Sequence, residues 1–121
     1  MLGVATALTA GLTLAAAQPA AASLIGAQEL AASAEESGRR INLWVIQIPF
    51  GVWAWHGQLE HGHAGDSVWI ENSGGDVVSS AYVPAGQSSV NTRVWFSSGT
   101  FRVCGKGEGR PDTFCSSFAR R

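Results

Sequence analysis

Residues 41–56 read INLWVIQIPFGVWAWH, and this stretch predicts a pair of β-strands. INLWVIQI (41–48) is rich in β-branched and aromatic residues and stops at Pro49, which is typical of a strand. It is nearly apolar on both faces, as expected for a strand that is covered on both sides. Alternation in VWAWH (52–56) divides its side chains between two faces, with Val52, Ala54 and His56 on one and Trp53 and Trp55 on the other.

Five further segments have strand character, and turn-forming residues separate them. They are SVWIE (67–71), DVVSSAYVP (76–84), SSVNTRVWF (88–96), TFRVCG (100–105) and TFCSSF (113–118). About seven short strands at regular spacing predict an all-β fold, a small antiparallel β-sandwich. We expect this domain to span residues 41–121.

The segment before the sandwich is expected to have two parts. Residues 1–22 carry no charge, are weakly apolar and end in Ala-Ala-Ala, which predicts a secretory signal peptide with an A-x-A cleavage site. Threonine and glycine dilute the apolar run, which argues against a membrane anchor. Residues 23–40 are small and polar with helical spacing of their few apolar positions, so they predict a flexible N-terminal extension that becomes helical on docking.

Composition narrows the class of protein. The chain has eight basic and nine acidic residues and shows no basic stripe, which argues against nucleic-acid binding. After signal cleavage we expect a secreted, extracellular protein that does not associate with a membrane. Its two cysteines, Cys104 and Cys115, are expected to form one disulfide hairpin, although a metal or redox pair is an alternative.

Candidate catalytic and metal-binding residues are few. His56, Glu60, His61 and His63 are the only clustered metal-type ligands, but the glycines around them indicate an exposed loop. Candidate carboxylates for glycosidase chemistry sit next to turns, where acidic residues are usual: Glu60, Asp66, Glu71 and Asp76. No G-x-S-x-G motif occurs. We therefore expect no enzyme activity, no cofactor and no metal site.

Five tryptophans in so short a chain are the strongest indication of function. They are Trp44, Trp53, Trp55, Trp69 and Trp95. Trp69 and Trp44 are assigned to the core. The alternation places Trp53 and Trp55 on one face, and two readings stay open: half of the core, or an exposed platform that stacks on sugar rings or fills a partner's pocket.

Several blocks of the chain resemble a group of small secreted actinobacterial β proteins. The blocks are WHGQL (55–59), GDSVWI (65–70), VPAGQSSVNTR (83–93) and RVCGK with its second cysteine (102–115). Size, signal and N-terminal extension also resemble the adaptor subunits of streptomycete umbrella toxin particles. That resemblance implies two partners, a trypsin-like lectin subunit and a large repeat-containing toxin subunit, with the segment Ser23–Ile48 docking in the lectin subunit's cleft.

The sequence thus predicts a non-catalytic protein–protein adaptor in an extracellular toxin assembly. The predicted binding residues are Leu43, Trp44, Val45, Trp53, Trp55, His56, Arg93 and Trp95. In this reading INLWVIQI adds to an exposed sheet edge of a partner, whereas the alternative makes it an ordinary strand of the sandwich. Two other functions stay open: a carbohydrate-binding module that uses Trp53 and Trp55, and an enzyme inhibitor that presents KGEGRPD (106–112).

Overall fold

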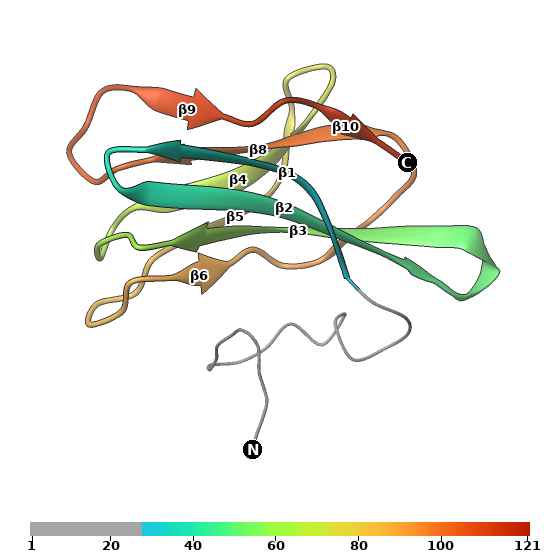
Figure 1. Cartoon of the computed structure of the whole chain (residues 1–121), viewed down its shortest axis with the longest axis horizontal. Helices are drawn as coiled ribbons and strands as arrows, with labels where there is room; N and C mark the ends of the chain where they lie inside the picture. The colour runs from blue at the N-terminus through green and yellow to red at the C-terminus, as the bar shows by residue number, and fades with distance from the viewer. Residues whose placement is uncertain (1–27) are drawn as a thin grey trace.

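The computed structural model describes residues 28–121 as two antiparallel β-sheets packed face to face (Figure 1). The predicted all-β sandwich is confirmed. The predicted signal peptide and residues 23–27 lie outside the described residues. The strands are β1 (Glu29–Glu36), β2 (Arg39–Ile48), β3 (Val52–Glu60), β4 (Ser67–Asn72), β5 (Val77–Tyr82), β6 (Val90–Asn91), β7 (Trp95–Phe96), β8 (Thr100–Lys106), β9 (Thr113–Cys115) and β10 (Ala119–Arg120).

The strand order differs between the two sheets. The first sheet runs β1-β2-β3-β6, and β7 also pairs with β3. The second runs β10-β8-β4-β5, and β9 also pairs with β8. The first sheet is therefore mostly a meander of neighbouring strands, whereas the second joins β4 to the distant β8.

Residues 41–56 form most of the long β2–β3 hairpin. Its register runs without a shift from Arg40 opposite Glu60 to Ile48 opposite Val52. The three-residue 3-10 turn Pro49–Gly51 closes it. In Figure 1 the closed end of this hairpin extends beyond the other strands.

The core lies between the two sheets and is built from alternate residues of the central strands. Its buried members are Ile41, Leu43, Val45, Trp55, Leu59, Val68, Ile70, Val83, Phe101 and Val103. The rings of Trp55 and Phe101 meet across the sheets with centroids 4.9 Å apart. Packing is tight at Gly105, where an added Cβ would lie 2.9 Å from Cγ2 of Ile41.

The predicted flexible, helix-forming extension is wrong from Glu29 onward, because that segment forms strand β1. It pairs with β2 from Glu29 opposite Val45 to Glu36 opposite Arg39, with one register shift next to Leu30. Without β1, the backbone edge of the apolar β2 would be unpaired, and this pairing overrides a sequence rich in Ala and Glu. The folded domain therefore begins before residue 41.

Residues 28–121 form ten strands where seven were expected, for three local reasons. β1 is additional, the segment SSVNTRVWF contributes two short strands instead of one, and β10 follows the last predicted strand. The predicted disulfide is confirmed: Cys104 of β8 and Cys115 of β9 lie directly opposite each other and are bonded. Within residues 28–121, no helix is long and apolar enough to cross a membrane.

Candidate functional site

Four of the predicted binding residues are buried, and we remove them from the candidate site. Leu43 and Val45 point into the core and are at most 1% exposed. Trp55 is fully buried, and its indole N–H donates to the backbone carbonyl of Ser97 over 2.7 Å. His56 lies on the opposite face of the sheet and is 3% exposed.

Of the two open readings of Trp53 and Trp55, half of the core or an exposed platform, the structure supports the core. Alternation does place the two side chains on one face of β3, but that face points toward the second sheet. Trp53 is partly buried and packs against the core. Trp44 is likewise partly buried and donates its indole N–H to Oε1 of Gln58 over 2.8 Å. Trp44 belongs to neither apolar cluster, so its assignment to the core is wrong.

The histidines do not come together. Burial lowers the pKa of His56 to about 4, so this side chain is neutral at physiological pH. His61 and His63 are exposed in the turn after β3. In the part of the chain that the structure describes, no group of three or more His, Cys, Asp or Glu side chains could hold a metal ion.

The candidate carboxylate Asp66 is an internal support of the fold. Its side chain is fully buried. The carboxylate accepts a hydrogen bond of 2.6 Å from Nε of Arg39 and hydrogen bonds of 2.7 Å from the backbone N–H groups of His63 and Glu108. Burial alone would raise the pKa of Asp66, but these hydrogen bonds outweigh it and hold the pKa below its usual range. The network ties β2 to the turn after β3 and to the β8–β9 loop.

The candidate carboxylate Glu71 also has structural partners. It accepts hydrogen bonds from the indole N–H of Trp69 over 2.8 Å and from the guanidinium of Arg102 over 2.8 and 3.1 Å. Burial would raise the pKa of Glu71, but Trp69 and Arg102 together lower it. Glu71 is therefore an ionised partner in an ion pair, and its oxygens are already engaged by Trp69 and Arg102.

The KGEGRPD loop that the inhibitor reading would present is tied to the body of the protein. The backbone N–H of Glu108 bonds to Asp66, and the guanidinium of Arg110 reaches Oγ of Ser37 over 3.3 Å. Gly107 is buried against the guanidinium of Arg39. The loop therefore serves as a cover for the buried ion pair.

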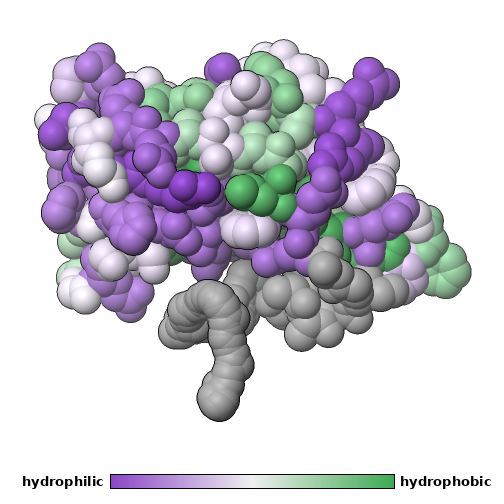
Figure 2. Space-filling view, in the orientation of Figure 1, coloured by the Kyte–Doolittle hydropathy of each residue, from purple (hydrophilic) through white to green (hydrophobic). Residues whose placement is uncertain are grey.

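The closed end of the β2–β3 hairpin is the first candidate surface, and we call residues 46–54 the arm. Phe50 at its tip is fully exposed, and Val52 is 39% exposed. Ile46 and Ala54 form a small apolar cluster of their own, separate from the main core, with Ile48 and Val94 packed against it. In Figure 2 the end of the arm, at the right, lacks the strong purple of the charged loops.

The apolar surface of the arm continues onto β7. Phe96 lies opposite Ala54 in the pairing of β7 with β3 and is 56% exposed. Sequence reasoning missed both Phe50 and Phe96. A Pro-Phe-Gly turn between two apolar strands was the available signal for Phe50, because a turn residue is exposed by position.

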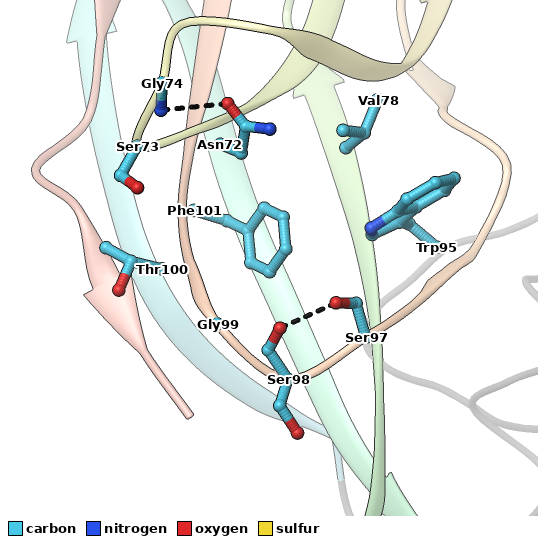
Figure 3. A pocket seen from close by; sticks show the side chains of 10 residues that line it. All are labelled: Asn72, Ser73, Gly74, Val78, Trp95, Ser97, Ser98, Gly99, Thr100 and Phe101. Atoms are coloured by element: carbon cyan, nitrogen blue, oxygen red, sulfur yellow. Dashed lines mark hydrogen bonds between the residues drawn. The ribbon is translucent and has the colours of Figure 1, made fainter.

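A pocket of about 290 Å³ is the second candidate surface. It lies where the two sheets part, between the β4–β5 turn and residues 97–100, with Trp95 and Phe101 in its wall (Figure 3). Of the predicted binding residues, Trp95 lines this pocket and is 39% exposed. Arg93 is exposed nearby, and its backbone carbonyl accepts the hydroxyl of Ser79 from β5 over 2.7 Å.

Comparison with known proteins does not identify the chain. It matches no protein-family model, no curated protein and no solved structure. The candidate surfaces are therefore interpreted from their own chemistry.

Proposed function

We propose that this chain is a secreted, non-catalytic binding protein that holds a second extracellular protein through its arm. One observation carries the proposal. Residues 41–59 contain no Asp, Glu, Lys or Arg, yet this uncharged hairpin ends in a fully exposed phenylalanine, Phe50. Exposed apolar patches on soluble proteins mark interaction sites, and aromatic residues at their centre carry much of the binding energy.

The backbone of the arm favours binding with little loss of conformational freedom. Phe50 has φ of 70° and ψ of 20°, in the left-handed region that a bulky residue seldom adopts. The pairing of Ile48 with Val52 below it and the proline before it hold this conformation. A strained residue kept in place at an exposed tip is typical of a functional loop, and here the backbone that carries Phe50 is already fixed before binding.

The arm replaces the mode of binding that the sequence suggested. Residues 41–45 of INLWVIQI cannot add to a partner's sheet, because they are paired on both sides, with β1 and with β3. The docking segment implied by the toxin-adaptor resemblance, Ser23–Ile48, is part of the sheet from Glu29 onward. A trypsin-like lectin subunit and a repeat-containing toxin subunit are the first partners to test, with contact through the arm.

Affinity purification from the culture supernatant of the producing organism tests this proposal. The tagged wild-type protein is compared with Phe50→Ser and with Tyr82→Ser, a control at another exposed aromatic, 69% exposed on the other sheet. We expect a stoichiometric partner with the wild type and Tyr82→Ser. Loss of Phe50 should weaken binding about thirtyfold, as for a central hot spot. Equal recovery with Phe50→Ser would refute the role of the arm.

A further inference from the structure

The pocket beside Trp95 has a chemical character that differs from that of the arm. Two aromatic rings, Trp95 and Phe101, contribute to its wall. The other lining residues include four that carry hydroxyls and one that carries an amide, and none carries a charge: Ser73, Ser97, Ser98, Thr100 and Asn72. Such a lining suits a neutral ligand that has both an apolar face and several hydroxyl groups.

One hydrogen-bond donor of the pocket remains available to a ligand. The indole N–H groups of Trp44, Trp55 and Trp69 each donate to a protein oxygen, but that of Trp95 has no acceptor among the described residues. Figure 3 shows the nitrogen-bearing edge of Trp95 turned toward the hollow. An indole N–H beside an open pocket is a ready donor to a ligand oxygen.

Other lining groups fix the shape of the pocket. Oδ1 of Asn72 accepts the backbone N–H groups of Gly74 and Asp76 at 3.0 and 2.9 Å, which holds the β4–β5 turn. The hydroxyl of Ser97 donates to the carbonyl of Ser98 over 2.6 Å. The hydroxyls of Ser98 and Thr100 point away from the hollow in Figure 3, so these two residues line it with their other atoms.

The wall formed by residues 97–99 is held from both sides. The backbone N–H of Ser97 donates to the carbonyl of Trp53 over 2.9 Å, and its own carbonyl accepts the indole of Trp55. Gly99 and Arg121 exchange two backbone hydrogen bonds of 2.8 and 3.0 Å. A wall anchored in this way is preorganised, so binding loses little conformational freedom.

We propose that this pocket binds one neutral sugar residue of a glycan. The C–H groups on one face of a pyranose are weakly positive and pack against the aromatic wall of the pocket. A ring hydroxyl accepts the indole N–H of Trp95, whose nitrogen-bearing edge is turned toward the hollow. A volume of about 290 Å³ is at the lower end of ligand pockets, which limits the site to a single ring.

None of the arm's residues lines the pocket, although the backbone carbonyl of Trp53 supports its wall. The test uses the ¹⁵N-labelled chain and methyl glycosides of glucose, galactose, mannose and N-acetylglucosamine as probes. Two-dimensional NMR follows the indole N–H of Trp95 and the amides of Ser97–Gly99 during titration. We expect at least one neutral glycoside to shift these signals in a saturable manner.

Variants make the test specific. Trp95→Phe keeps an aromatic ring but removes the indole N–H, and should weaken binding about threefold to tenfold, as for the loss of one hydrogen bond. Trp95→Ala should abolish binding, whereas Phe96→Ser, its exposed neighbour outside the pocket lining, should retain it. A flat titration with all four glycosides, or wild-type affinity in both Trp95→Phe and Trp95→Ala, would overturn the proposal.

Discussion

Buried His56 predicts that the protein loses stability at mildly acidic pH. Burial lowers its pKa from 6.5 to about 4, so the unfolded chain binds a proton in this pH range and the folded chain does not. Acid therefore stabilises the unfolded state. Each pKa unit is worth about 1.4 kcal/mol, so the full effect below pH 4 is about 3 kcal/mol.

A narrower pH window isolates this histidine from the carboxylates. Between about pH 7.5 and about pH 5, linkage for a group titrating at 6.5 unfolded and about 4 folded predicts a loss of about 2 kcal/mol. The lowered pKa values of Asp66 and Glu71 have little effect there, because an unfolded carboxyl titrates near pH 4. Their contribution to stability is lost only as the pH falls further.

Urea unfolding followed by tryptophan fluorescence at the two pH values measures the effect. The wild type should show the loss, and so should the control His63→Gln, whose side chain is exposed. His56→Gln removes the histidine whose pKa is lowered by folding, so the stability of this variant should be nearly equal at both pH values, whatever its absolute value. An undiminished pH dependence in His56→Gln would show that another group is responsible.

Three further variants test the contacts that join the sheets and loops. Asp66→Asn leaves the buried Arg39 guanidinium without a counter-charge and should lower the free energy of unfolding by about 3–5 kcal/mol in urea titrations; a loss below about 1 kcal/mol would contradict the buried ion pair. Replacing both Cys104 and Cys115 by alanine should cost about 3 kcal/mol from the loop that the bond closes, and unchanged thermal stability under reducing conditions would argue against it. Gly105→Ala places a methyl group against Ile41 and should cost about 1–3 kcal/mol in the same titrations, so a neutral result would contradict the close approach of the sheets.

The hairpin was the most predictable part of the fold. Its two strands follow from β-branched and aromatic residues on either side of a Pro-Phe-Gly turn, and the alternation in β3 correctly separates Trp55 from His56. Alternation does not say which face is inside. The Trp53–Trp55 face packs on the second sheet, and this depends on residues such as Phe101 that are far away in the sequence.

Strand β1 and the pocket could not be predicted from local sequence. Glu29–Glu36 has the composition of a helix and becomes a strand only because β2 offers it an unpaired edge. The pocket needs the β4–β5 turn and residues 97–100 to meet, and no local pattern in either segment encodes that meeting. The sequence indicated Trp95 as a binding residue only because it is a tryptophan, and it did not indicate the residues that line the pocket with it.

The unequal strand orders of the two sheets have a consequence for folding. β1, β2 and β3 are neighbours in the sequence, so their pairing closes only short loops and can begin while the chain is being synthesised. The pairing of β4 with β8 instead closes a loop of some thirty residues, for example between Asn72 and Phe101, which lie opposite each other. Until β8 arrives, only the β4–β5 hairpin is available to cover the inner face of the meander. The C-terminal third of the chain thus completes the core, and until it does so the exposed apolar face makes the chain prone to aggregate.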